Sequence, residues 1–183
     1  MNEKSKPLEK KYSFLLVDGY NLIHQMPEIS RHLNHDLQRA RELLIIKLAN
    51  FATRNQLQIT LVFDGQNLEF ADHASQPGVK VIFSKGVKAD LKIKELASRL
   101  ARDNRKKDWL VVTSDFDIGY YVEGLGLKTE SSRAFASRLQ AEESKIKKKM
   151  EAKRNRVEAE PEEKKLPARD REWIYSVFME KKK

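Results

Sequence analysis

The sequence contains no cysteine. Disulfide bonds, thiolate zinc sites and cysteine nucleophiles are therefore excluded. No apolar run approaches the roughly 18 residues that a membrane-spanning helix needs. The first residues, Met1 to Lys11, are polar and of mixed charge, unlike a secretory signal. These absences lead us to expect a soluble protein of the cytoplasm.

Two further absences narrow the chemistry. The chain has no glycine-rich phosphate loop with a lysine, and Asp18-Gly19-Tyr20 is not the paired-aspartate pattern of aspartyl-phosphate enzymes. A phosphatase or nucleotide hydrolase is therefore the weakest of the metal-dependent alternatives. The four histidines are scattered in loop-like sequence, so we do not expect a histidine metal site.

The length and the charge of the chain are both informative. With 183 residues it can form one α/β domain with an appendage. Its formal net charge of +9 and its isoelectric point near 9.6 favour a polyanionic partner. Nine Lys and Arg against three acidic residues lie between Lys85 and Lys107. From Ala141 onward there are 14 basic and 10 acidic residues, so this extension is highly charged and moderately basic.

Short apolar runs alternate with helical periodicity. The runs, typical of strands buried on both faces, are Ser13–Asp18, Leu57–Phe63, Val79–Phe83 and Trp109–Val112. The segments with helical spacing are Asp36–Arg54, with Leu37, Ala40, Leu44, Leu48 and Phe51 on one stripe, and Ala89–Asp103, with Ile93, Leu96, Ala97 and Leu100. This alternation predicts an α/β fold with a parallel sheet and helices on both faces.

The last third of the chain is predicted to be mainly helical. A short helix from Asp115 through Val122 leads through a glycine turn to a brief edge strand at Leu127–Lys128. Ser131 or Ser132 can cap a further helix that continues through Met150. A final amphipathic helix is expected at Arg169–Met179. We therefore expect a domain over residues 12–140 and a charged helical extension over residues 141–183.

Four aspartates occupy related positions in this pattern. Asp18, Asp64 and Asp115 each end or follow a predicted strand, and Asp90 opens a predicted helix. Because ligands bind beyond the carboxyl ends of parallel strands, the four side chains are expected to converge there. Converging carboxylates repel one another, and a bound divalent cation is the usual way to keep them ionised. The pattern predicts a metal-dependent enzyme.

The ligand types favour Mg²⁺ or Mn²⁺ over zinc, because the candidates are hard oxygen ligands. Such ions suit phosphoryl chemistry, since they neutralise a phosphodiester and lower the pKa of a bound water. We expect Asp18, Asp90 and Asp115 to be the metal ligands. Four residues are expected to support them through hydrogen bonds or as outer ligands: Asn21, Thr113, Ser114 and Asp117.

Basic residues near the aspartates predict contacts with a nucleic acid. Lys85, Lys88 and Lys92 are expected to line the approach of the backbone, together with Arg99. Tyr20 can stack on a base or pack in the domain.

Four segments together resemble the YacP-like branch of the NYN domain family, whose members are similar to PIN and FLAP nucleases. They are Leu15-Leu16-Val17-Asp18-Gly19-Tyr20-Asn21, Val62-Phe63-Asp64-Gly65, Lys88-Ala89-Asp90 and Thr113-Ser114-Asp115. The likeness covers about residues 12–140. It implies a three-layer α/β/α sandwich with a mainly parallel, PIN-like sheet.

The resemblance also implies a Mg²⁺- or Mn²⁺-dependent endoribonuclease. Asp18, Asp64, Asp90 and Asp115 would form its catalytic site. RNA would be the partner, and a ribonucleoprotein such as the ribosome is the larger target that the charged extension could favour. This chain departs from the family at Lys94, where an acidic residue is common, and at Ile118-Gly119, which replaces a more polar pair. The alternative is a catalytically weak or inactive RNA- or ribosome-binding module with the same fold.

Overall fold

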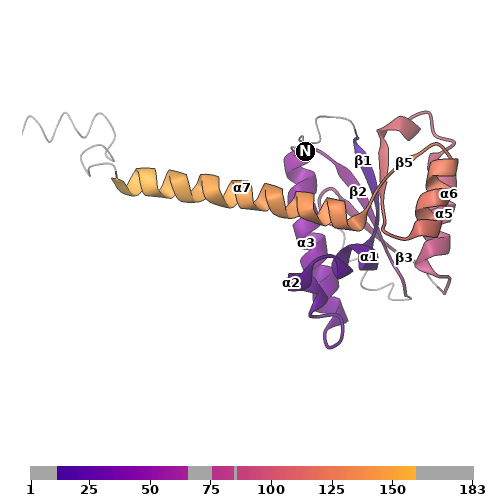
Figure 1. The fold of residues 1–183 in the computed structure, drawn as a ribbon, viewed down its shortest axis with the longest axis horizontal. Helices are drawn as coiled ribbons and strands as arrows, with labels where there is room; N and C mark the ends of the chain where they lie inside the picture. The colour runs from indigo at the N-terminus through magenta and orange to yellow at the C-terminus, as the bar shows by residue number, and fades with distance from the viewer. Residues whose placement is uncertain (1–11, 66–75, 85, 160–183) are drawn as a thin grey trace, which may run out of the picture. The chain divides into compact units, whose positions relative to one another are not determined.

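The computed structural model describes residues 12–65, 76–84 and 86–159. Five strands form one parallel sheet in the order β3-β2-β1-β4-β5. In chain order they are β1 (Phe14–Asp18), β2 (Gln58–Phe63), β3 (Val79–Phe83), β4 (Trp109–Val112) and β5 (Lys128–Glu130). The four strands predicted from apolar runs are confirmed, with β3 at one edge of the sheet, and β5 at the other edge begins one residue later than predicted. Figure 1 shows the sheet with its flanking helices.

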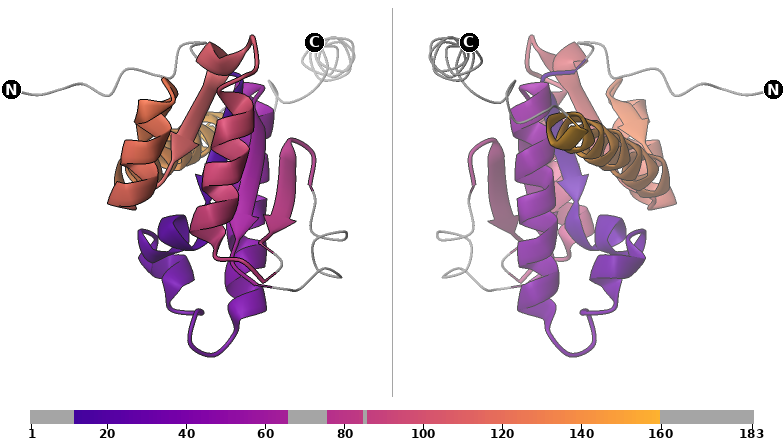
Figure 2. Two further views of the ribbon diagram at one scale, coloured as in Figure 1. Left: turned by 90° about the vertical axis from the view of Figure 1, so that its right-hand side faces the viewer. Right: turned by 90° about the vertical axis from the view of Figure 1, so that its left-hand side faces the viewer.

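Helices cover both faces of the sheet. They are α1 (Gly19–His24), α2 (Pro27–Ser30), α3 (Leu37–Asn55), α5 (Ala89–Leu100), α6 (Phe116–Gly124) and α7 (Ser132–Ala159), with a 3-10 turn, η1, at Lys106–Asp108. In the left view of Figure 2, α5 and α6 lie in front of the sheet. In the right view, from the opposite side, α3 lies in front of it. The predicted three-layer α/β/α sandwich is therefore confirmed.

The two faces follow from the alternation of side chains along each strand. Leu15 and Val17 of β1 belong to a buried cluster with α1, α2, α3 and the start of α7. Leu16, between them, belongs to the opposite cluster with Ile93 of α5 and Ile118 of α6. Apolar residues on both faces explain why the strands read as continuous apolar runs.

Several predicted details differ from the structure. Leu37, assigned to the apolar stripe of α3, is 38% exposed because it lies at the first residue of the helix. The helix predicted to reach Asp103 ends at Leu100, where Asp103 starts a turn by accepting a hydrogen bond from the backbone N–H of Arg105. The helices α1 and α2 were not predicted, since four to six residues are too few for a periodic pattern.

The helix predicted to start at Ser131 or Ser132 is α7, and it continues without interruption to Ala159. The Ser131 hydroxyl accepts a hydrogen bond from the N–H of Ala134 at its start. The chain divides into two compact units, Met1–Leu139 and Gln140–Lys183. The helix predicted at Arg169–Met179 lies outside the described residues. In the described part of the chain, no helix combines the length and apolar character that a bilayer crossing requires.

Candidate active site

The strand order creates a switch point between β1 and β4. From β1 the chain runs outward through β2 and β3 on one side, whereas β4 and β5 lie on the other side. In open parallel sheets, ligands bind beyond the carboxyl ends of the strands at such a point. Asp18 is the last residue of β1, and Thr113 directly follows β4. These two residues therefore mark the candidate site.

Asp18 is held by three hydrogen bonds. It is only 5% exposed. Its Oδ1 accepts from the backbone N–H of Asn21 at 3.2 Å, which caps helix α1. Its Oδ2 accepts from the Asn21 side-chain amide at 2.8 Å and from the Thr113 hydroxyl at 3.4 Å. The predicted support by Asn21 and Thr113 thus corresponds to direct contacts with Asp18.

The electrostatic surroundings disfavour the charge on Asp18. Burial is the largest cause that raises the pKa of its carboxyl, and the negative charge of Asp90 raises this pKa further. The hydrogen bonds from Asn21 and Thr113 act in the opposite direction and are outweighed. Asp90 is therefore close enough to Asp18 for its negative charge to oppose the ionisation of Asp18.

Asp115 is tied to Asp18 through Thr113. Its backbone N–H donates to the Thr113 hydroxyl at 3.1 Å, while that hydroxyl donates to Asp18. The Oδ1 of Asp115 caps α6 by accepting from the N–H of Ile118 at 2.9 Å. The hydroxyl of Ser114 accepts from the N–H of Ser132 at 3.0 Å, so it joins this loop to the start of α7.

The four aspartates do not form one cluster. Asp64 is exposed, and its Oδ1 accepts a hydrogen bond from the Ser84 hydroxyl at 2.9 Å, which joins the ends of β2 and β3 instead. Asp117 is exposed in the first turn of α6. Within the described ranges, no three His, Asp or Glu side chains are grouped so that they could hold one metal ion. The expected convergence of all four carboxylates is therefore corrected: β1 separates Asp64 from the β4 side of the site.

The basic residues predicted to bind RNA differ in their exposure and in their ion pairs with acidic side chains. Lys88 is exposed at the residue before α5, two residues before Asp90 in the chain. Lys92 and Arg99 both form ion pairs with Glu95, at 2.9 Å and 2.5 Å. Lys85 lies outside the described residues. Of the predicted basic contacts in the described chain, Lys88 is thus the one placed best to meet a phosphate at the site.

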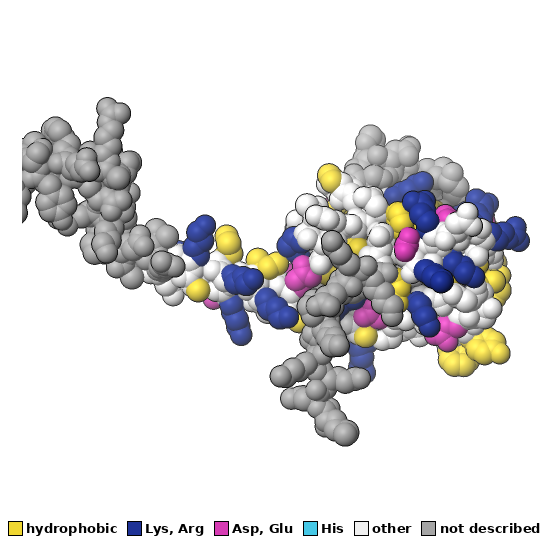
Figure 3. All heavy atoms as spheres, turned by 90° about the horizontal axis from the view of Figure 1, so that it is seen from above, with side chains coloured by type: hydrophobic (Ala, Val, Ile, Leu, Met, Phe, Trp, Pro, Cys, Tyr) yellow, Lys and Arg dark blue, Asp and Glu magenta, His cyan; other side chains and the backbone are white. Residues whose placement is uncertain are grey.

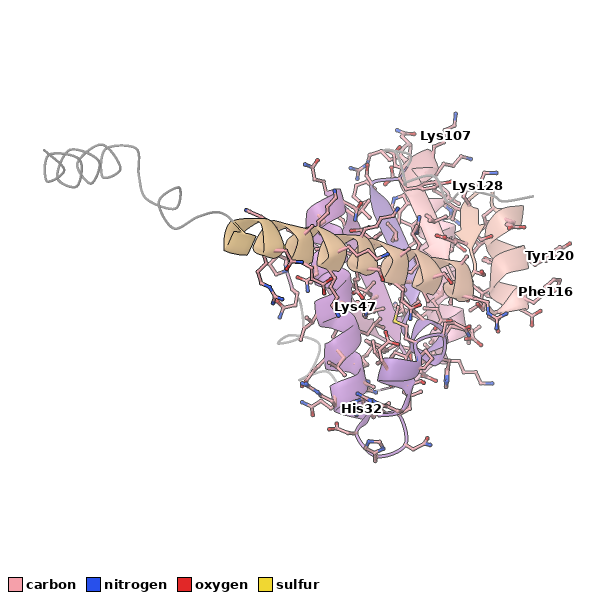
Figure 4. All side chains as sticks on the ribbon, turned by 60° about the vertical axis from the view of Figure 1, so that its left-hand side comes forward. His32, Lys47, Lys107, Phe116, Tyr120 and Lys128 are labelled. Atoms are coloured by element: carbon pink, nitrogen blue, oxygen red, sulfur yellow. The ribbon has the colours of Figure 1, made fainter. Side chains whose placement is uncertain are left out.

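Part of the predicted basic surface lies at the amino-terminal ends of the strands, away from Asp18. Arg102, Arg105 and Lys107 are exposed around η1, which precedes β4. Lys107 marks this end of the molecule in Figure 4, and the view onto it shows Lys and Arg side chains gathered there (Figure 3). The segment between Lys85 and Lys107 therefore does not form one continuous approach to Asp18.

A buried arginine was missed by the sequence analysis. Arg41 of α3 is only 7% exposed, donates hydrogen bonds to the Tyr20 hydroxyl, and lies over the rings of Phe63 and Phe83 at 5.7 and 5.2 Å. Tyr20 also packs edge-on against Phe63. These contacts give Tyr20 a packing role, the second of its two expected roles. The period of α3 could have shown Arg41, because it lies beside the buried Ala40 and Leu44.

Known proteins with similar sequence and structure exist. The sequence profile of the YacP-like NYN domain family matches residues 15–178. The uncharacterized protein YacP of Bacillus subtilis (strain 168) is 29% identical over 138 residues, which cover 74% of this chain and 80% of that protein. A crystal structure of Rae1 (YacP) from Bacillus subtilis covers 80% of this chain and 84% of its own, with a TM-score of 0.65 and 28% identity. A second, of a single-residue mutant, covers 90% and 99%, with a TM-score of 0.61 and 26% identity.

These matches reach further along the chain than the resemblance found in the sequence. The family profile ends at residue 178, so the family likeness includes most of the charged extension beyond residue 140. NYN domains form a PIN-like nuclease family, and the fold is accordingly of ribonuclease type. Because the profile spans most of the sequence, this chain belongs to the YacP-like NYN domain family.

Proposed function

We propose that this protein is a metal-dependent endoribonuclease that hydrolyses RNA phosphodiester bonds at Asp18. The observation that carries the proposal is the position and state of this carboxylate. It is buried at the switch point of the sheet, it is oriented by Asn21 and Thr113, and its charge is opposed by burial and by Asp90. Such a charge needs a cation, and the family is one of nuclease-type proteins.

The donor set fits Mg²⁺ or Mn²⁺. Mg²⁺ in enzymes is commonly held by one or two carboxylates and keeps several waters, so a group of three acidic side chains is not required. Asp18 and Asp90, whose charge raises the pKa of Asp18, would be two such carboxylates. Asp115 is linked to Asp18 through Thr113 and is the third candidate ligand. All three would offer oxygen atoms, which suit these hard cations.

Each residue of the site has a distinct task in this proposal. The bound ion supplies charge neutralisation of the phosphodiester and a lower pKa for the attacking water. Asn21 and Thr113 hold Oδ2 of Asp18 in one orientation, which spares the reaction the cost of ordering this carboxylate. Asp90 is exposed and is therefore the carboxylate that solvent and substrate reach directly. Lys88, two residues before Asp90, can pair with a substrate phosphate.

The substrate is expected to be single-stranded or otherwise exposed RNA. Asp18 is buried at the carboxyl end of the central strand β1, so the scissile phosphate must be brought close to it. A flexible strand can do this more readily than a stiff duplex. The preference for RNA over DNA depends on the family. The charged extension beyond residue 140 is expected to add affinity for RNA or for a ribonucleoprotein such as the ribosome.

Cleavage of a short single-stranded RNA is the direct test. We expect internal cuts in the presence of Mg²⁺ or Mn²⁺ and none in excess EDTA, measured on a gel with RNA labelled at one end. Restoration of cleavage when the metal is added back is the control against irreversible damage. An absence of cleavage with both metals, for a folded protein that binds RNA, would contradict the proposal.

Binding of the metal is also expected to stabilise the fold in a pH-dependent way. Because the pKa of Asp18 is raised, its carboxyl group stays protonated, and therefore binds a cation poorly, up to a higher pH than an exposed aspartate does. In the metal-free protein, stability contributed by this group falls as the pH rises from the unfolded pKa through the raised folded pKa.

Mg²⁺ should therefore raise the thermal midpoint clearly at pH 7.5 and little at pH 5. A metal concentration of 100 times the dissociation constant corresponds to about 2.7 kcal/mol. Differential scanning fluorimetry with and without Mg²⁺ measures this difference, with Asp18→Asn as the control. Equal shifts for the wild type and this variant would place the metal elsewhere.

The alternative function is an RNA-binding module without catalysis. It is favoured by the absence of a three-carboxylate group in the described residues and by Lys94. Lys94 stands where the family commonly has an acidic residue, and its ammonium group lies 5.8 Å from the centre of the Tyr121 ring. Salt-sensitive RNA binding without turnover would favour this alternative.

A further inference from the structure

Two aromatic side chains on α6 are almost fully exposed. Phe116 is 82% exposed and Tyr120 is 76% exposed. Their ring centroids are 6.3 Å apart and their planes differ by only 18°. Figure 4 shows both rings extending outward from α6. We call this pair the aromatic platform.

The exposure of the platform is not required by the fold. On α6, Ile118 and Val122 are buried against the sheet, and they anchor the helix without help from the platform. Phe116 and Tyr120, four residues apart, lie together on another side of the helix. Folding gains little from aromatic rings that remain in water, and large exposed apolar groups mark binding sites. The same reading of the helical period could have identified the platform from the sequence.

The platform adjoins the candidate active site. Phe116 is the residue directly after Asp115, whose carboxylate caps α6 and whose N–H is linked through Thr113 to Asp18. Helix α5 packs beside α6 and also begins at this edge of the sheet. Its exposed Leu91 follows Asp90 directly. A strand of nucleic acid with one phosphate at Asp18 would thus have its neighbouring nucleotides near α6.

The chemistry of the platform matches nucleic-acid bases. Nearly parallel flat rings accept a base by stacking, and this contact is independent of the identity of the base. Tyr121, on the same helix, has the ammonium group of Lys94 over its ring. Lys94 of α5 thus places one positive charge near the aromatic residues of α6, whereas Asp117 of α6 itself is acidic, so stacking rather than charge is the main attraction expected here. A surface that binds another protein through apolar contacts alone would not need to lie next to Asp18.

We propose that Phe116 and Tyr120 stack with unpaired bases of RNA next to the scissile phosphate. This inference rests on the proposed function for its location, and it adds a base-binding subsite to that function. The platform would increase affinity for single-stranded RNA without taking part in the hydrolysis itself. Because stacking needs an unpaired base, it would also disfavour double-stranded RNA.

The test compares two single-stranded RNAs of equal length, one normal and one with three consecutive abasic nucleotides. Binding is measured by fluorescence anisotropy with the full chain in EDTA, so that no cleavage occurs. Wild-type protein should bind the normal RNA at least about tenfold more tightly than the abasic RNA. The double variant Phe116→Ala/Tyr120→Ala should bind both RNAs equally, with the affinity of the wild type for the abasic RNA.

Two controls separate stacking from other effects. The exchange Phe116→Tyr/Tyr120→Phe keeps two rings and should restore the preference for the normal RNA. Ile46→Ala removes a residue of similar exposed character from α3, on the opposite face of the sheet, and should change nothing. The dependence of affinity on salt should be the same for wild type and double variant, since no charge is removed.

The inference is overturned if the double variant keeps the wild-type preference for the normal RNA, as it would if the platform binds another protein. It is also overturned if the wild type binds both RNAs equally. Failure of the proposed function looks different: the wild type would then prefer the normal RNA and cut neither RNA with any metal. That result would leave the platform as the base-binding surface of an inactive module.

Discussion

Asp18→Asn should lower RNA cleavage by about 10²–10³-fold while the protein remains folded. The change removes the negative charge that would hold a divalent cation, and it keeps the size of the side chain. The remaining Oδ1 can still accept the hydrogen bond from the N–H of Asn21 that caps α1. The loss should appear in the rate at saturating RNA, measured with Mg²⁺ and with Mn²⁺.

The stability of Asp18→Asn is a second readout. Burial and the charge of Asp90 both raise the pKa of Asp18, so its ionised form destabilises the metal-free fold at neutral pH. The amide carries no charge, so the unfolding temperature of the metal-free variant should fall less than that of the wild type as the pH rises through the raised pKa of Asp18. The amide nitrogen cannot accept the two hydrogen bonds that Oδ2 accepts, so the variant should lose some stability at every pH. Thermal unfolding at several pH values measures both effects.

Asp108→Asn is the matched control for this experiment. Asp108 ends η1, directly before β4. It therefore lies at the amino-terminal end of that strand, whereas Asp18 lies at the carboxyl end of β1. The same chemical change there should leave cleavage within about twofold of the wild type, since surface substitutions have small effects. If Asp18→Asn kept a tenth or more of the wild-type rate, the proposed role of Asp18 would have to be abandoned.

Gly19→Ala should destabilise the protein by about 2–3 kcal/mol. A Cβ atom at this position would lie 2.5 Å from Cδ1 of Phe63 and 2.9 Å from the carbonyl oxygen of Val62. Phe63 is fully buried between Tyr20 and Phe83, and the carbonyl belongs to the backbone of β2. Neither neighbour can move without disturbing the sheet. Glycine is thus required here for close packing.

The damage should extend to the site, because Gly19 directly follows Asp18. A shift of the chain at Gly19 would move the carboxylate away from Asn21 and Thr113, and cleavage should fall even where the variant is fully folded. Urea denaturation measures the stability, and the cleavage assay at low temperature measures the activity of the folded fraction.

Gly119→Ala, also in a helix, should stabilise the protein, in contrast to Gly19→Ala. Apart from its chain neighbours and the backbone of its own helix, no atom lies within 4 Å of a Cβ placed at Gly119, which is in the middle of α6. Alanine favours a helix over glycine by about 0.8–1.0 kcal/mol, so this variant should be more stable than the wild type. Equal effects of the two substitutions would show that the contact with Phe63 does not matter.

The sequence predicted the fold well because each strand is marked by a run of apolar residues within one short segment. Runs such as Val79–Phe83 and Trp109–Val112 match the observed strands residue for residue. Their apolar character on both faces requires helices on both faces, and this leads directly to three layers. Short elements without a period, such as α1, had no comparable signal in the sequence.

The candidate site was predicted in part. The sequence placed Asp18, Asp64 and Asp115 at the same edge of the sheet, which is correct. It could not say which of them meet, because any strand can neighbour any other in a parallel sheet. The observed order puts β4 next to β1 and so brings Thr113 to Asp18, whereas Asp64 is engaged by Ser84.

By itself the sequence therefore determined the strands, their common direction and the edge at which the aspartates lie, because each follows from patterns within a few neighbouring residues. Only the tertiary structure decided the burial of Asp18 and the packing role of Tyr20 beside Arg41. These features depend on side chains that are far apart in the chain and are brought together by packing. A carboxylate acquires an unusual pKa only from such neighbours and from the loss of water around it.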